Sequence, residues 1–346
     1  MNRLEDRYRR VLRLLPASYR QAWEEDMVAT FLQSEQPEDT EDAEFAADYG
    51  RPSLPEVASV VALAVRLRLG GDGSPPRYLA WGETVRRLAL VGLLVQAVAA
   101  LAGLGAGLWS PWVTNVVAVD RAADVQALFG LVWVAAYLSL VTGRWRSARL
   151  LAVLALAPSV VFFAVDFATV EGAYGLSRVT GLLVDAVPVL ALAAFHRQAS
   201  PVKARPWLIA LPVGVSLLTI AMLLTSFTAP ALVDWPGVVC TAVFVAAVMY
   251  LSVPGMSWRS ATVSWSTTLA LFALTALGQR VVTLLDYLQF AARTADLDVM
   301  ITIAAVQAAA VLVIATPLTM LAAKAMRTLP AVAAPVKSST PPGETD

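Results

Sequence analysis

The sequence predicts an all-α protein in which a polytopic transmembrane bundle of about eight helices follows a small cytosolic helical domain. Of the 346 residues, 58% are hydrophobic and only 15% are charged, whereas charged residues make up ~25% of soluble domains. Apolar stretches of 17 to 24 residues recur from residue 88 onward, and each can cross a ~30 Å hydrocarbon core. Charge is concentrated at the front, where residues 1–87 hold 12 of the 26 basic and 15 of the 26 acidic residues. The front quarter therefore faces water.

An amphipathic helical hairpin is predicted for residues 1–33. Apolar residues at helical spacing mark one face of its first helix: Leu4, Tyr8, Val11, Leu12 and Leu15. Pro16 ends this helix, and Ser18 with Gln21 predicts a capping box for the next one. Four residues spaced by four are expected to pack the second helix against the first: Tyr19, Trp23, Met27 and Phe31. Glu24, Glu25 and Asp26 are expected to face water or a partner.

Two further segments precede the membrane part. Residues 34–53 are predicted to form an acidic linker, since seven acids and no base occur in residues 34–48. Such runs are usually solvated, although recruitment of a basic partner is the alternative. Residues 54–87 are predicted to contain a third helix at 54–69 and a hinge at GGDGSPP. The apolar run of this helix is too short to cross a bilayer.

Residues 88–323 are predicted to form the eight-span transmembrane domain, and residues 324–346 a disordered cytosolic tail. The expected spans are 88–109, 124–142, 150–170, 179–195, 207–227, 237–253, 263–283 and 299–322. With both termini in the cytosol of a cell-membrane protein, 22 basic residues lie on the inner side and four on the outer side, as the positive-inside rule requires. The seventh span is the least certain, because it can continue as one helix of 30 residues.

A resemblance can be drawn from the pattern YRRVLRLLPASYRQAWEEDMVATFL at residues 8–32. It resembles the short helical permease-prefix region that precedes the membrane parts of some bacterial multi-pass proteins. The whole chain is similar to uncharacterised integral membrane proteins of actinobacteria, and its 23 arginines against three lysines suit a high-GC genome. This resemblance implies no catalytic residues. The chain differs from true permeases because it has no large extracytoplasmic domain.

Familiar enzymatic signatures are missing from the sequence. The single histidine, His196, rules out a two-histidine zinc site, and the lone cysteine, Cys240, lies in an apolar run typical of a buried core residue. The glycine cluster at 70–73 lacks the lysine of a phosphate-binding loop. We therefore expect no enzymatic activity, no metal, no cofactor and no nucleic-acid binding.

Ionisable residues near the spans are the candidate functional residues, because charge within a membrane is costly and commonly functional. The predicted cluster lies toward the outer leaflet and comprises Asp166, Asp185, Arg178, Arg280 and Asp286. One interpretation is an ion-pair network that fixes helix packing. The other is an outward cavity that binds an ion, a proton or a small polar solute.

A second candidate feature is a ridge of small residues in the first span, at Ala99, Gly103 and Gly107. Small residues spaced by four let two helices approach closely. The ridge is expected to serve packing within the chain, with dimerisation as the alternative.

Three functions remain open from the sequence. The favoured one is a non-enzymatic membrane protein with a regulatory or scaffolding role, in which residues 1–69 bind the membrane bundle or a cytosolic protein. The second is a transporter of small solutes or ions that uses the predicted cluster. The third is a membrane enzyme acting on lipid-linked substrates, although acids beside arginines suit binding better than proton transfer.

Overall fold

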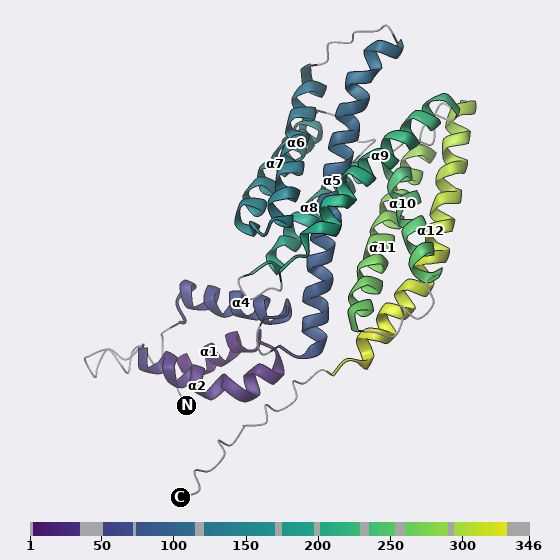
Figure 1. Cartoon of the computed structure of the whole chain (residues 1–346). Coiled ribbons are helices and arrows are strands. Elements are labelled where there is room, and N and C mark those ends of the chain that lie inside the picture. The colour runs from purple at the N-terminus through teal and green to yellow at the C-terminus, as the bar shows by residue number, and fades with distance from the viewer. Residues whose placement is uncertain are drawn as a thin grey trace, which may run out of the picture. The chain divides into compact units, whose positions relative to one another are not determined.

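The structure is a computed structural model that describes residues 3–34, 51–71, 74–114, 121–169, 175–196, 201–228, 235–252, 260–289 and 294–330. Within these ranges every regular element is a helix, so the predicted all-α fold is confirmed (Figure 1). The chain divides into two compact units. Unit 1 comprises Met1–Glu83 and Met326–Asp346, and unit 2 comprises Thr84–Ala325. Each unit is described by itself.

Unit 1 is built from α1 (Arg3–Leu12), α2 (Ala17–Ser34), α4 (Leu54–Arg68) and the first two turns of α5 (Pro76–Thr114). Each of the first three helices contributes apolar side chains to one core. The buried members are Leu4, Tyr8, Leu12, Leu15, Val28, Phe31, Val60, Ala64 and Leu67. The sequence pattern identified the contribution of the first helix correctly, including Leu15, which lies in the turn after α1.

The turn between α1 and α2 differs from the predicted capping box. Helix α2 begins at Ala17, so Ser18 lies inside the first turn instead of preceding it. The carbonyl oxygen of Pro16 accepts hydrogen bonds from the backbone N–H groups of Tyr19 and Arg20, both at 3.0 Å. Because this carbonyl already starts the helix, the hydroxyl of Ser18 is not needed as a cap.

The junction between α4 and α5 is close-packed. Ser53 caps α4 by accepting a hydrogen bond from the backbone N–H of Glu56, and Gly70, at φ +82°, turns the chain after the helix in a conformation that suits glycine. The first turns of α5 then return against this turn. A methyl group placed on Gly82 would overlap the carbonyl oxygen of Leu69 and lie 3.1 Å from the nitrogen of Gly70. Glycine is therefore required at position 82.

Unit 2 contains the rest of α5 together with α6 (Arg121–Val141), α7 (Trp145–Thr169), α8 (Gly175–Ala191), the short η1 (Leu192–Ala194), α9 (Ala204–Thr228), α10 (Trp235–Ser252), α11 (Ser260–Gln289) and α12 (Ala295–Thr328). Helices α5 to α12 overlap the eight predicted spans in order. In the described part, six are long and apolar enough to cross a membrane, and α6 and α10 contribute the shorter apolar stretches Phe129–Val141 and Pro236–Ser252. The uncertain seventh span is one continuous helix of 30 residues.

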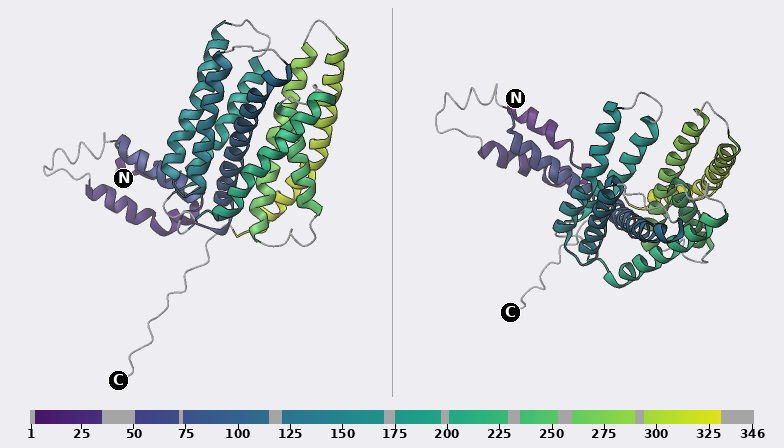
Figure 2. Two further views of the ribbon diagram at one scale, coloured as in Figure 1. Left: turned by 45° about the horizontal axis from the view of Figure 1, so that its top comes forward. Right: turned by 90° about the horizontal axis from the view of Figure 1, so that it is seen from above.

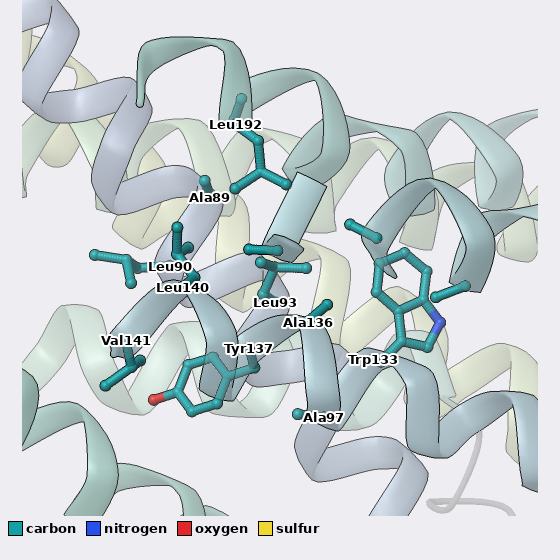
Figure 3. Packing of buried hydrophobic residues seen from close by; sticks show 14 of the residues in the cluster. Ala89, Leu90, Leu93, Ala97, Trp133, Ala136, Tyr137, Leu140, Val141 and Leu192 are labelled. Atoms are coloured by element: carbon teal, nitrogen blue, oxygen red, sulfur yellow. The ribbon is translucent and has the colours of Figure 1, made fainter. Parts of the chain in front are cut away.

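Two cores hold unit 2 together. The first joins α5, α6, α7, η1 and α9, and Figure 3 shows Leu93 and Ala97 of α5 among residues of α6 such as Tyr137. The second joins α10, α11 and α12, which gather as a separate group in both views of Figure 2. Many of the buried residues are alanines, whereas large apolar side chains such as Leu150 and Val313 point outward. This distribution suits lipid-facing helices that approach each other through small residues.

The predicted ridge of small residues was expected to contact a neighbouring helix, and its described part does not do so at Gly103. Among the described residues, nothing lies within 4 Å of a methyl group placed on Gly103. The side chain of Ala99 is half-buried, and residue 107 lies outside the part of α5 whose side chains are described. Close approach instead occurs at Gly92, where α5 meets α8, and at Gly214, where α9 meets Val98 of α5. The packing role predicted for Gly103 is therefore wrong within the described chain, and dimerisation stays a prediction.

Candidate functional site

A polar site formed by three helices surrounds Asp185 in unit 2. The side-chain amide of Gln96, on α5, donates a hydrogen bond to Oδ1 of Asp185, on α8, at 2.7 Å. The hydroxyl of Ser159, on α7, donates to Oδ2 at 3.3 Å. Asp185 lies ten residues after the start of α8, or about 15 Å along the helix axis. That is close to half of a ~30 Å hydrocarbon core.

Local packing explains why these helices meet at Asp185. A methyl group on Gly92 would lie 2.7 Å from Cβ of Pro188, so α5 and α8 touch where glycine leaves room for the proline ring. Consecutive spans cross a membrane in alternating directions. Because α5 is the first span and α8 the fourth, the two helices run in opposite directions. One turn beyond Gly92 on α5 is therefore level with one turn before Pro188 on α8, and this register brings Gln96 to Asp185.

The chemistry of this site allows two roles. Each carboxylate oxygen of Asp185 accepts one hydrogen bond from a neutral donor, which stabilises a polar group inside an apolar bundle. Such bonds can simply hold helices together. An aspartate at this depth can also take up and release a proton or a small cation.

The predicted outer-leaflet cluster does not converge on Asp185 among the described residues. No ion pair within 4.0 Å joins Asp185 to Arg178 or Arg280, or Arg280 to Asp286. Arg178 precedes Asp185 by seven residues, which places it on the same face but about 10 Å away along α8. Arg280 and Asp286 are six residues apart, so they point to different sides of α11. The side chain of Asp166, the remaining member, lies outside the described residues, so the cluster as a whole stays a prediction.

The remaining predicted residues can be placed individually. Arg280 and Asp286 are both buried on α11, at 1% and 8% exposure, and Arg178 is half-buried near the start of α8. The side chain of Asp166 lies outside the described residues. Sequence reasoning missed Gln96 and Ser159 because it considered only charged residues. The signal was available, since Gln96 interrupts the apolar run LVGLLVQAVAALAG at residues 90–103.

A second polar region lies where α5, α9 and α11 meet. The guanidinium of Arg87 lies 4.7 Å from the ring centre of Trp265, which is 6.3 Å from the ring of Trp207. The hydroxyl of Thr268 donates to the carbonyl oxygen of Ser264 at 2.6 Å and lies 3.4 Å from that of Thr84. Cation–π contacts and hydroxyls that donate to carbonyls of their own helix are common in helix packing. We assign this region a structural role.

Unit 1 contains an open pocket beside its aromatic core. Its volume is about 310 Å³, and its lining comprises Tyr8, Asp26, Met27, Thr30, Phe31, Ser34 and Glu56. The hydroxyl of Tyr8 donates to Oε1 of Glu56 at 3.0 Å, and its ring stacks on Phe31 with centroids 4.0 Å apart. Burial, and next the hydrogen bond to Glu56, raise the pKa of Tyr8 above its usual range. The phenol therefore stays a donor at neutral pH.

The residues predicted to pack α2 behave unequally. Phe31 is buried, Tyr19 and Met27 are half-buried, and Trp23 is 52% exposed. Each step of four residues turns the helix by about 40° beyond a full circle, so a strict four-residue spacing drifts around α2. Trp23 therefore leaves the core face and lies only against Tyr19, with ring centroids 6.5 Å apart. Its predicted packing role was wrong, and Val28 is buried in its place.

Arg9 links α1 to α2 at the surface of unit 1. Its guanidinium donates two hydrogen bonds of 2.8 Å to the carboxylate of Glu25 and one of 2.9 Å to Glu5. Glu24 lies 3.6 Å from the same guanidinium. The hydrogen bonds from Arg9 lower the pKa of Glu25. Of the three acids expected to face water or a partner, Glu24 and Glu25 are thus engaged within unit 1, and Asp26 borders the pocket.

Comparisons with protein-family models, with curated proteins and with solved structures found no match for this chain. Neither the permease-prefix resemblance nor the actinobacterial resemblance is supported. Among the described residues, no group of three or more histidines, cysteines or acids is placed to hold a metal ion. The coarse conclusion is that this is a helical protein with several helices able to span a membrane.

Proposed function

We propose that this chain is a non-enzymatic multi-pass membrane protein that regulates or positions a cytosolic protein through unit 1. The observation that carries the proposal is the open pocket of unit 1 that Tyr8, Asp26 and Glu56 help to line. Unit 1 has its own apolar core, so the pocket is built on a packed framework.

The lining of the pocket suits a basic side chain of the partner. Asp26 and Glu56 provide carboxylates, and Tyr8 occupies only one oxygen of Glu56. Phe31 and Met27 provide an apolar floor. Arginine combines bonding to carboxylates with stacking on aromatic rings. The hydroxyls of Thr30 and Ser34 donate to carbonyls of their own helix, so their oxygens remain available as acceptors.

Photo-crosslinking in living cells tests this proposal. A photoreactive amino acid at Thr30, on the rim of the pocket, should give a discrete protein adduct, whereas the same group at the exposed Ser59 of α4 should not. Asp26→Lys should remove the adduct, because it repels a basic partner. Gln21→Lys also places a lysine on α2, about 140° away, and should leave the adduct intact. An adduct that survives Asp26→Lys, or no adduct from Thr30, would refute binding at this pocket.

A second function, proton-coupled or ion-coupled transport, is favoured by the three-helix site at Asp185. Asparagine at position 185 keeps the size of the side chain and one acceptor oxygen, which can still accept the hydrogen bond from Gln96, but it cannot ionise. In proteoliposomes with a potassium gradient and valinomycin, the natural protein should carry protons that an internal dye detects, and Asp185→Asn should abolish this flux. Asp298→Asn, at an exposed acid of α12, is the matched control. Equal flux in both variants, or none in the natural protein, would leave Asp185 with a packing role alone.

A further inference from the structure

Helix α4 has a second apolar face that the described residues of unit 1 do not cover. Its core face lies against α1 and α2, but Leu54, Val61 and Val65 are 86%, 41% and 45% exposed, and Ala58 between them is exposed as well. On a helix of 3.6 residues per turn these four positions fall within about 60° of one another. They form a continuous strip, called the outer strip below. An apolar strip of this kind on a helix beside a membrane needs a cover.

The third side of α4 is polar. Ser59 and Arg66 are exposed and lie roughly 120° around the helix from the outer strip. Helix α4 thus has a buried side, an exposed apolar side and an exposed polar side. This profile is typical of helices that lie in the plane of a bilayer surface.

Chain connectivity keeps the end of α4 close to the bilayer. Only the residues between Arg68 and Pro76 separate α4 from α5, and Gly82 of α5 packs directly against Leu69. The helix that begins at Pro76 is itself a candidate membrane span. Its uninterrupted apolar stretch begins at Leu88, which is six residues, or about 9 Å, beyond Gly82. The headgroup layer is about 5–7 Å deep on each side of the hydrocarbon, so this connection is short enough for the α4–α5 junction to reach the headgroups.

Other exposed apolar side chains of unit 1 come from the segments that meet at this junction. Leu14 is exposed, and its carbonyl oxygen accepts a hydrogen bond of 2.9 Å from Arg68. Leu79 and Trp81 are exposed on the first turns of α5, where the backbone of Leu79 adjoins Gly70. Tryptophan favours the membrane–water interface. Exposed apolar side chains therefore also occur on the segments next to the part of the chain that enters the membrane.

We propose that the outer strip of α4 lies in the headgroup region of the bilayer, so that α4 is an interfacial helix. The occupant of this face is lipid, and the pocket of unit 1 stays in water. Glu56, which lines the pocket, is about 160° around α4 from the centre of the outer strip, so the two surfaces do not compete.

Spin labels at single cysteines test this proposal in the full chain. The only natural cysteine, the buried Cys240, is first changed to serine. Labels are then attached at Val61→Cys and at Val65→Cys. The matched control is a label at Ser59→Cys, on the exposed polar side of the same helix. The protein is placed in phosphatidylcholine–phosphatidylglycerol nanodiscs, and the collision rates of each label with oxygen and with a water-soluble nickel chelate are measured. Oxygen concentrates in lipid and the chelate in water.

The expected result is a several-fold higher ratio of oxygen to nickel collisions at positions 61 and 65 than at position 59. High nickel access at 61 and 65 would show that the outer strip faces water and would overturn the proposal. Low access to both reagents would show that protein covers the strip, either the membrane bundle or a second copy, and would overturn it equally. Since all three sites are exposed, the labels fit without disturbing the core, and protection of α1 and α2 from trypsin verifies that each variant is folded.

Discussion

Replacement of Gly82 by alanine is expected to separate α4 from α5 and to destabilise unit 1 by about 3 kcal/mol or more. The added methyl group would overlap the carbonyl oxygen of Leu69. A flexible side chain could move away from such an overlap, but this atom belongs to the backbone just after α4. The collision is therefore relieved only if one of the two helices moves. Faster hydrogen exchange in α4, measured by mass spectrometry in nanodiscs, would report this movement.

Gly103→Ala is the matched control on the same helix. Among the described residues, nothing lies within 4 Å of a methyl group at position 103. Alanine is preferred to glycine inside helices by roughly 0.5–1 kcal/mol, so this substitution should leave exchange unchanged or slow it. Opposite effects of the same chemical change at two positions of α5 would separate crowding from helix propensity. Unchanged exchange in Gly82→Ala would mean that the junction is looser than described.

Phe31→Ala should produce the other large effect, the loss of the folded state of unit 1. Phe31 is 4% exposed and stacks on Tyr8 in the middle of the core. Such truncations cost about 3–5 kcal/mol, and a unit of this size has only a few kcal/mol of stability in total. Trypsin should then cut rapidly at arginines of α1 and α2, such as Arg10 and Arg20, while the helices of unit 2 remain protected by the membrane.

Trp23→Ala removes a larger aromatic residue from the same helix and serves as the control. Its side chain is 52% exposed, and changes at such surface positions cost about 0.5 kcal/mol or less. Cleavage by trypsin should therefore proceed at the natural rate. Rapid cleavage in Trp23→Ala would mean that Trp23 belongs to the core after all, as its four-residue spacing from Tyr19 and Met27 suggested.

Elements set by hydrophobic pattern were predicted well from this sequence. The order of the helices, the third helix at 54–69 and the single long helix from Ser260 follow from the period and length of apolar runs, which act locally. The start of α2 was missed by two residues, because the backbone carbonyl of Pro16 accepts the first hydrogen bonds of the helix in the place expected of Ser18. Every residue has the same backbone carbonyl, so the sequence does not indicate which carbonyl accepts the first hydrogen bonds of a helix.

The candidate site was predicted only in part, and the reason lies in helix rotation and register. Asp185 was identified because an acid is conspicuous in an apolar span. Its neighbours depend on which faces of α5, α7 and α8 meet, and this is set by the contact between Gly92 and Pro188. The sequence around Gln96 or Ser159 does not indicate the contact between Gly92 and Pro188. The same limitation led to the expectation that Arg178 and Arg280 would join Asp185, since charge suggests a partner but not a direction.

The helices that surround Asp185 are also synthesised in a fixed order. Gln96 and Ser159 belong to α5 and α7, and both are synthesised before α8. An aspartate in the middle of an inserting helix costs ~2.5–3.5 kcal/mol on insertion scales. Both of its hydrogen-bond donors have already left the ribosome when Asp185 emerges, whereas Arg280 follows almost a hundred residues later. The one acid deep in α8 thus reaches the membrane with its partners made in advance, and its burial need not wait for the second half of the bundle.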